Sequence, residues 1–254
     1  MLEKYPIILG MLILLLEAKL KIMGELAESK KYSFVAFLMS PKSICSGAVI
    51  APKSILTSAH CVCKEYKTLN AFLLMDSYKL KNFELTASEY FVHDQYQEMC
   101  ADYEKEVKST NRVNSYDIAM LRFKETITDH KGVSTVKINY NFEVPMKGYD
   151  LLILGYGDNK REQKLDHIFL RTKVLTTECA KEYSGNPICV TVKVTKVKGS
   201  VLEFNRLSGA PLYDKHKKVL VGVYSGTKNT RDQDSSQLAV RVTSVMSFIK
   251  EHVQ

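Results

Sequence analysis

Three residue types that together perform nucleophilic catalysis stand in three separate stretches of the chain. His60 lies in SILTSAHCV, Asp117 in NSYDIAMLRF and Ser208 in LSGAPL. A serine hydroxyl is a weak nucleophile that needs a base within hydrogen-bond reach, and the base needs an acid to hold its tautomer. Each residue alone is weak support for such a site. The remaining histidines are interpreted as structural, namely His93, His130, His167, His216 and His252.

The elements that would position these residues are short strands. Apolar runs rich in Val, Ile, Tyr and Phe alternate with polar turns, as in YSFVAFLM, DLLILGYG and KVLVGVYSG. This pattern predicts an all-β sandwich or barrel. Residues 64–114 carry polar clusters between weak strands, so we expect long loops there. One helix is expected at the end of the chain, over 242–254, with Thr243 or Ser244 as its N-cap.

The sequence segments around the three residues resemble motifs of the chymotrypsin/trypsin family of serine peptidases. CSGAVIAPKSILTSAHC is similar to the family's first bridge and histidine box, YDIAMLRF to its aspartate box and SGAPL to its serine box. The order His, Asp, Ser is also that of the family. The resemblance implies two six-stranded antiparallel β-barrels, a C-terminal α-helix and an active site between the barrels. It implies His60 as general base, Asp117 as orienting acid and Ser208 as nucleophile.

The loop before the serine departs from the family pattern. KIMGE resembles an activation site, where cleavage after Lys21 would free Ile22 as a new N-terminus. Family members pair that N-terminus with an aspartate at the position of Leu207, which has no charge to offer. Arg206 replaces a glycine whose N–H faces the developing oxyanion, and losing one such donor costs on the order of 10² to 10³ in rate.

The resemblance also implies an altered specificity pocket. Leu202 replaces the aspartate of trypsin-like enzymes, which argues against a preference for Lys or Arg. Ser225 keeps its expected place, while Thr227 and Gln237 occupy wall positions that are glycine in open pockets. We expect these side chains to narrow or fill the pocket.

Six cysteines after an apolar leader indicate disulfides formed in an oxidising compartment. The resemblance implies the pairs Cys45–Cys61 and Cys179–Cys189. Cys63 and Cys100 remain, and in the family fold their loops flank the same rim of the cleft, so we expect a third bridge. A zinc site is the alternative for CVC, but C-x-C without a second close pair is poor ligand spacing. Neither a metal nor another cofactor is expected.

The N-terminus has the layout of a signal peptide, with Lys4, the apolar run 7–16 and a cleavage position at Ala18. We expect a signal peptide over 1–18, a propeptide over 19–21 and a peptidase domain over 22–254. An uncleaved anchor is the alternative. No later segment of the sequence is long and apolar enough to cross a membrane. The protein is expected to be secreted and monomeric.

The net charge of +8 and pI near 9.0 favour contact with acidic surfaces, such as an acidic polysaccharide. No nucleic-acid motif accompanies the charge. The basic runs TVKVTKVKGS and DKHKK are interpreted as a solvated strand face and a turn. The changes at 206, 207 and 237 favour a catalytically silent or very weak homologue that binds substrates, proteases or inhibitors. The alternatives are an active endopeptidase preferring small apolar side chains and a structural secreted protein.

Overall fold

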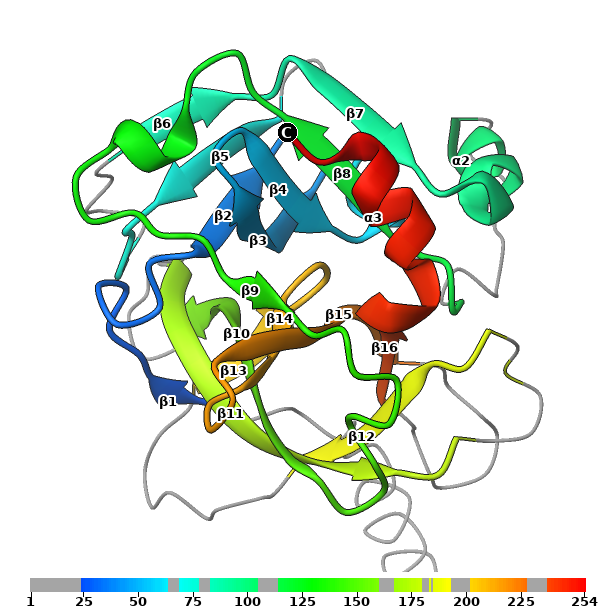
Figure 1. Cartoon of the computed structure of the whole chain (residues 1–254). Helices are drawn as coiled ribbons and strands as arrows, with labels where there is room; N and C mark the ends of the chain where they lie inside the picture. Colours follow the sequence, from blue (N-terminus) through cyan, green and yellow to red (C-terminus); the bar gives the residue numbers. More distant parts are fainter. Residues whose placement is uncertain are drawn as a thin grey trace, which may run out of the picture.

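The computed structural model describes residues 24–63, 69–77, 83–104, 114–159, 167–179, 183, 185–192, 202–227 and 237–254. Within these residues no helix is long and apolar enough to cross a membrane. The chain forms two antiparallel β-barrels, with the first above the second in Figure 1. The predicted all-β fold with a C-terminal helix is confirmed.

The first barrel is a seven-stranded sheet in the order β6-β5-β2-β3-β4-β8-β7. β6 and β7 are the two edge strands of this order, and only Ala87 and Ser88 separate them in the sequence. One bent stretch of chain therefore supplies both edges of the sheet. The N–H of Ala87 donates to Leu69 O, and that of Ser88 donates to Arg122 O. The bend thereby closes the sheet. Its strands are β2 (Val35–Met39), β3 (Ile44–Ala51), β4 (Ser54–Thr57), β5 (Asn70–Leu73), β6 (Phe83–Thr86), β7 (Glu89–Val92) and β8 (Ala119–Arg122).

The second barrel is part of a nine-stranded sheet that closes through the pairing of β10 with β11. The ring of strands runs β10-β11-β12-β16-β15-β14 and returns to β10, while β1, β9 and β13 pair at its margins. The strands are β1 (Glu25–Leu26), β9 (Lys137–Ile138), β10 (Asp150–Asn159), β11 (His167–Thr177), β12 (Ile188–Val192), β13 (Leu202–Arg206), β14 (Pro211–Asp214), β15 (Val219–Thr227) and β16 (Gln237–Arg241).

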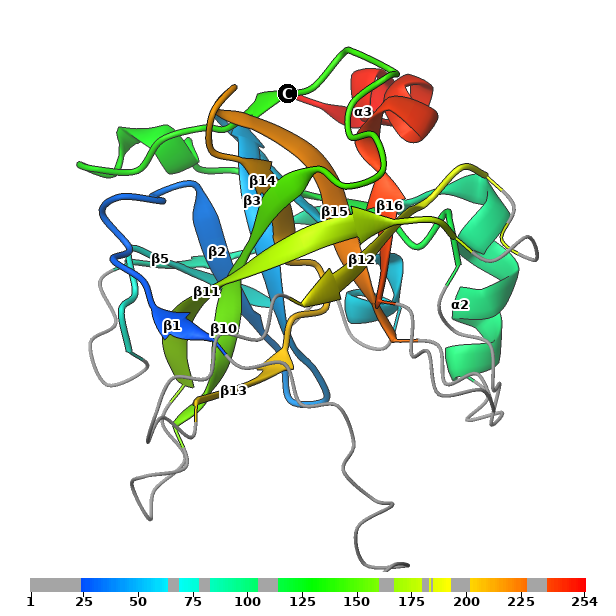
Figure 2. The same ribbon diagram turned by 90° about the horizontal axis from the view of Figure 1, so that it is seen from below.

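Short helical elements connect and flank the barrels. The 3₁₀ turns are η1 (Ala59–Cys61), η2 (Asp94–Tyr96), η3 (Ile127–Asp129) and η4 (Val242–Val245), and the helices are α2 (Gln97–Glu104) and α3 (Met246–His252). The hydrophobic pattern did not predict α2. In Figures 1 and 2, α3 lies at the outside of the molecule and runs from β16 toward the first barrel. There the N–H of Gln254 donates to the Ser54 hydroxyl, which ties the C-terminus down.

The expected N-cap of the C-terminal helix is wrong. Thr243 and Ser244 lie inside the η4 turn, and Val245 precedes α3 without a side-chain cap. Apolar packing decides the geometry here, because Val242 and Val245 are fully buried and draw this segment onto the core. Thr243 is buried with them and caps nothing.

Candidate active site

His60 and Asp117 are brought together by the pairing of two strands in the first barrel. Thr57, at the end of β4, pairs with Ala119 at the start of β8. His60 follows β4 by three residues, and Asp117 precedes β8 by two, so antiparallel pairing places both at one end of the barrel. Nδ1 of His60 lies 2.7 Å from Oδ2 of Asp117, and the main-chain N–H of His60 donates to Oδ1 at 3.0 Å.

The second barrel adds a third donor to the same carboxylate. The hydroxyl of Ser225, on β15, donates to Oδ2 of Asp117. Asp117 is fully buried, whereas the His60 side chain is 19% exposed. Because Nδ1 faces the carboxylate, Nε2 is the ring nitrogen available to take up a proton. Within the described residues, neither Nε2 of His60 nor the Ser208 hydroxyl makes a hydrogen bond.

The loop that carries Ser208 is held by main-chain hydrogen bonds from both sides. The N–H of Ser46, on β3, donates to Ser208 O at 2.8 Å. The N–H of Gly209 donates to Tyr224 O, also at 2.8 Å, and Tyr224 N–H donates back to Ala210 O. The first of these bonds comes from the first barrel and the other two from the second. Ser208 therefore lies where the two barrels meet.

Gly209 is required by this turn for two separate reasons. Its φ of +79° lies in the left-handed region that L side chains rarely adopt. A Cβ at this position would also lie 2.1 Å from the carbonyl oxygen of Ser46 and 2.1 Å from the Thr57 hydroxyl. No side chain fits there without moving the backbone of β3.

Leu207 anchors the same loop through apolar contacts. Its side chain is 3% exposed and belongs to the apolar core of the second barrel, with Ile153 and Leu212. It lies against β10, where a Cβ on Gly155 would be 3.2 Å from Cδ2 of Leu207. The loop is thus shaped without a charge at position 207. Ile22, the new N-terminus that cleavage after Lys21 would free, lies outside the described residues.

Arg206 is the last residue of β13 rather than part of a free turn. It pairs with Tyr156 on β10, and its carbonyl oxygen accepts from the Ser46 hydroxyl at 3.2 Å. The Ser46 hydroxyl also accepts from the N–H of Tyr156 at 3.3 Å. One serine of the first barrel therefore joins β10 and β13 beside the nucleophile loop.

β15 and β16 carry three of the residues that we expect to line the specificity pocket, namely Ser225, Thr227 and Gln237. Thr227 pairs with Gln237 at the ends of these strands. Gln237 is 1% exposed, and the buried hydroxyl of Tyr224 donates to its Oε1. Leu202 begins β13, and the side chains of Leu202 and Thr227 lie outside the described residues. A hydrogen-bonded tyrosine and glutamine are thus buried on these two paired strands.

Sequence reasoning missed Tyr224, Ser46 and Thr57 as members of this site. Tyr224 directly precedes Ser225, and its polar tip within an otherwise apolar strand was the available signal. Ser46 and Thr57 lie in the stretch that resembles the histidine box, but no local pattern reveals the bond from Ser46 to Arg206, 160 positions away.

The three disulfides join the expected pairs. Bridges connect Cys45 with Cys61, Cys63 with Cys100, and Cys179 with Cys189. The first ties η1, which carries His60, to β3, and the second joins Cys63, two residues after η1, to α2. Among the described residues, Cys45, His60 and Cys61 form the cluster of metal-ligating types, but the two sulfurs are bonded to each other and offer no thiolate.

Comparisons with known proteins agree on one family. The family model described as Trypsin matches residues 22–249. The cercarial protease of Schistosoma mansoni is 25% identical over 165 residues, which cover 63% of this chain and 62% of that protein. Trypsin 5G1 of Aedes aegypti is 22% identical over 82% of this chain and 74% of its own length.

Solved structures share the fold at lower identity. The scabies mite inactivated protease paralogue S-I1 is 20% identical with a TM-score of 0.68, covering 90% of this chain and 98% of its own. Human heparin binding protein is 15% identical with a TM-score of 0.67, covering 91% and 95%. Neuropsin, a serine protease of mouse brain, is 17% identical with a TM-score of 0.66, covering 90% and 97%.

Proposed function

This chain belongs to the trypsin family of serine peptidases, and on that premise we propose that it is a secreted homologue that is catalytically silent or very weak and acts by binding other proteins. The hydrogen bond between Tyr224 and Gln237 carries the proposal. Both side chains are buried on the paired strands β15 and β16, which we expect to line the pocket for a substrate side chain. To admit a substrate side chain, the protein would have to break this buried bond and expel Gln237, which lowers affinity for every substrate.

The nucleophile loop supports the same conclusion. Arg206 is held in β13 by its pairing with Tyr156, at the position expected to supply an oxyanion donor. A rigid oxyanion donor is worth on the order of 10² to 10³ in rate. The Ser208 hydroxyl also rests without a hydrogen bond to His60. Among the described residues, the proposed triad is therefore linked by hydrogen bonds between His60 and Asp117, and no bond joins Ser208 to them.

A second candidate function is weak endopeptidase activity toward small apolar side chains. The bonds from His60 and Ser225 to Asp117 favour it, since they hold Nε2 of His60 ready to accept a proton. In that reaction Oγ of Ser208 would attack the scissile carbonyl carbon, and its proton would pass to Nε2. Asp117 would stabilise the resulting imidazolium, and the proton would then leave with the departing amine.

The proposal includes processing and secretion. We assign residues 1–18 to a signal peptide and 19–21 to a propeptide, with cleavage after Lys21 freeing Ile22. The three disulfides support an oxidising compartment. The binding partners would be protein substrates, proteases or their inhibitors, met by a monomer. Two neighbours of the same fold are named as an inactivated protease paralogue and a heparin binding protein, so an acidic polysaccharide is a further ligand class.

An active-site serine probe separates the two functions. A fluorophosphonate reacts with Ser208 only if the base and the oxyanion donors are assembled. We expect the purified protein, cleaved after Lys21, to remain unlabelled under conditions that label trypsin fully. Ser208→Ala serves as the blank. Stoichiometric labelling that this substitution abolishes, with peptide turnover near the enzyme median of about 10 s⁻¹, would establish the peptidase instead.

A gain-of-function variant sharpens the test. Gln237→Gly together with Arg206→Gly removes the glutamine from the pocket and the side chain from the oxyanion position. We expect labelling of Ser208 in this double variant to exceed the product of the two single effects, because the residues flank one site and couple. Lys131→Gly, at an exposed position beside Gly132, is the control for the stability cost of introducing a glycine.

A further inference from the structure

A shallow apolar groove of about 400 Å³ lies between β9, the start of β15 and the helix α3. Ile138, Val219, Met246 and Val253 line it and are each partly exposed. We call this the β9–α3 groove. It contains none of the residues proposed for the active site, and its volume is within the range of small ligand pockets, about 300 to 1,000 Å³.

The groove has a rigid floor. Ile249 and Val136 lie beneath it and are buried in the core. One wall is fixed by the pairing of β9 with β15, in which Ile138 lies opposite Leu220. The N–H of Asn139 donates to Leu220 O at 2.9 Å and extends this ladder by one bond. The apolar surface is therefore held open rather than free to collapse.

The rim of the groove is basic. The charged residues that line it are Lys137 on β9 and Lys250 on α3, both exposed. Within the described part of the chain, neither ammonium forms an ion pair. Lys218, exposed in the turn before Val219, adds a third cation next to the lining. Tyr140 stands at the edge with 64% of its surface exposed.

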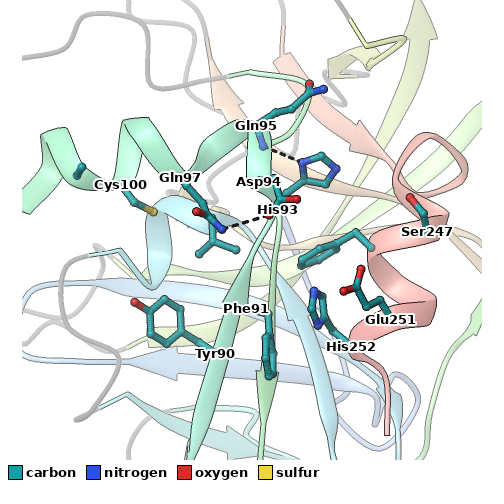
Figure 3. A pocket seen from close by; sticks show the side chains of 13 residues that line it. Tyr90, Phe91, His93, Asp94, Gln95, Gln97, Cys100, Ser247, Glu251 and His252 are labelled. Atoms are coloured by element: carbon teal, nitrogen blue, oxygen red, sulfur yellow. Dashed lines mark hydrogen bonds between the residues drawn. The ribbon is translucent and has the colours of Figure 1, made fainter.

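The opposite side of α3 has a different character, as Figure 3 shows. A cavity of about 690 Å³ there is flanked by Asp94 and Glu251. Its aromatic surfaces already have partners: His252 stacks on Phe91 with centroids 4.4 Å apart, and the Arg122 guanidinium covers the same ring at 4.5 Å. The β9–α3 groove thus differs in combining open apolar surface with unpaired cations.

We propose that the β9–α3 groove binds an acidic segment of a partner protein, with one large apolar side chain in the groove and flanking carboxylates at Lys137 and Lys250. Charge complementarity identifies the partner, because the lining offers cations and apolar surface but no anion. The concave shape favours a peptide side chain over a flat lipid surface. The chain's net charge of +8 would also steer an acidic partner toward it.

This inference deepens the proposed binding role by naming a surface and a partner chemistry. It is separable from the proposal for the cleft, because the groove lining includes none of His60, Asp117 and Ser208. A fluorophosphonate that labels Ser208 would overturn the silent cleft and leave the groove untouched. Failure of the peptide to bind would overturn the groove proposal and leave the proposal of a silent cleft intact.

The probe is a fluorescein-labelled peptide with one phenylalanine between pairs of glutamates, titrated by anisotropy at low ionic strength. We expect Lys137→Glu with Lys250→Glu to weaken binding roughly tenfold or more, since two attractive pairs become repulsive. The matched control is Lys30→Glu with Lys173→Glu, two exposed lysines outside the groove with the same change in net charge. The control should bind like the unmodified protein. Tyr140→Ser should weaken binding a few-fold without changing the charge.

Four results would overturn the proposal. The first is no saturable binding of the peptide, and the second is equal weakening in the lysine control, which would show unspecific attraction. The third is binding to phosphatidylserine vesicles that depends on Lys137 and Lys250 while the peptide does not bind, which would assign the surface to lipid. The fourth is self-association lost in the groove variant, which would assign it to a second copy of the chain. All of these variants change exposed side chains, and thermal melting checks that each remains folded.

Discussion

The candidate active site takes one half from each barrel, and different forces hold the two halves. On the first barrel, the fully buried Asp117 accepts hydrogen bonds from the main chain and ring of His60 and from Ser225. On the second barrel, Leu207 packs into an apolar core and Gly209 fits against β3. The polar half is held by hydrogen bonds to one buried carboxylate, while the other half is held by apolar packing and close backbone contact. Separate substitutions can therefore test each half of the site.

The largest effect is expected from placing a charge in the apolar half. Leu207→Asp should lower the free energy of unfolding by about 4–5 kcal/mol, because it buries a carboxylate among apolar side chains. Leu207→Met, similar in volume, should cost less than about 1.5 kcal/mol. Urea denaturation measures both. If protein cleaved after Lys21 accepted the aspartate without loss, the new N-terminus would be its partner, and apolar anchoring would be the wrong account.

A second variant tests whether the loop shape is fixed by close contact. Gly209→Ala should cost on the order of 4 kcal/mol, since it combines a left-handed backbone with overlap against Ser46 and Thr57. Gly148→Ala is the matched control, with φ of +77° but nothing within 4 Å of the added carbon. Its cost should be only about 1–2 kcal/mol. Equal losses in the two variants would mean that backbone strain alone fixes the loop.

The polar half can be tested at its centre. Asp117→Asn should cost about 2–3 kcal/mol, because an amide cannot accept all three hydrogen bonds and turns a donor toward another donor. Asp129→Asn, on an exposed side chain, should have almost no effect. Denaturation curves at neutral pH compare them. A loss below that of the control would show that His60 and Ser225 are positioned by other contacts.

The tyrosine in the pocket is expected to contribute less. Tyr224→Phe should cost about 1–2 kcal/mol, because Oε1 of Gln237 loses this donor in a buried site. Tyr213→Phe is the control, since the Tyr213 hydroxyl makes no hydrogen bond within the described residues. Calorimetric melting of both variants measures the difference. Identical melting temperatures would contradict the proposal that the Tyr224–Gln237 bond closes the pocket.

The smallest effect concerns the buried aspartate of the second barrel, Asp214. The Tyr149 hydroxyl donates to it at 2.6 Å, and this bond, with burial and the nearby charge, raises the pKa of Tyr149 to about 12. A phenol titrates near 10 when unfolded, so the contribution to stability is complete below pH about 10 and is lost as pH rises toward about 12. Tyr149→Phe should flatten this part of the stability profile. An unchanged alkaline slope would contradict the assignment.

Much of this architecture could be predicted from local sequence. Alternating apolar runs predict the strands, and the words around His60, Asp117 and Ser208 predict which strand ends should meet. The three cysteine pairs follow from resemblance and from one remaining pair. These features succeed because their signal lies within a short window of residues or in a family pattern.

Other features depend on contacts between distant segments and gave no local signal. In the sequence, Leu207 indicates only the loss of a charged residue. In the structure its side chain packs into the apolar core, because Gly155 leaves room for it on β10. Tyr224 and Gln237 are 13 residues apart, and only the pairing of β15 with β16 shows that they meet. The predicted N-cap of α3 was wrong for a related reason, since core packing of Val242 and Val245 outweighs the capping preference of Thr243 and Ser244.

The bonds of Ser46 have a consequence for the order of folding. Its N–H and hydroxyl reach Ser208 and Arg206 across a separation of about 160 residues, from one barrel to the other. Contacts so distant in sequence form late, because each barrel must first close its own loops. The main-chain amides of the nucleophile loop should therefore become protected from hydrogen exchange later than the amides of either barrel. The slow protection phase of the loop would report the docking of the two barrels rather than the folding of either.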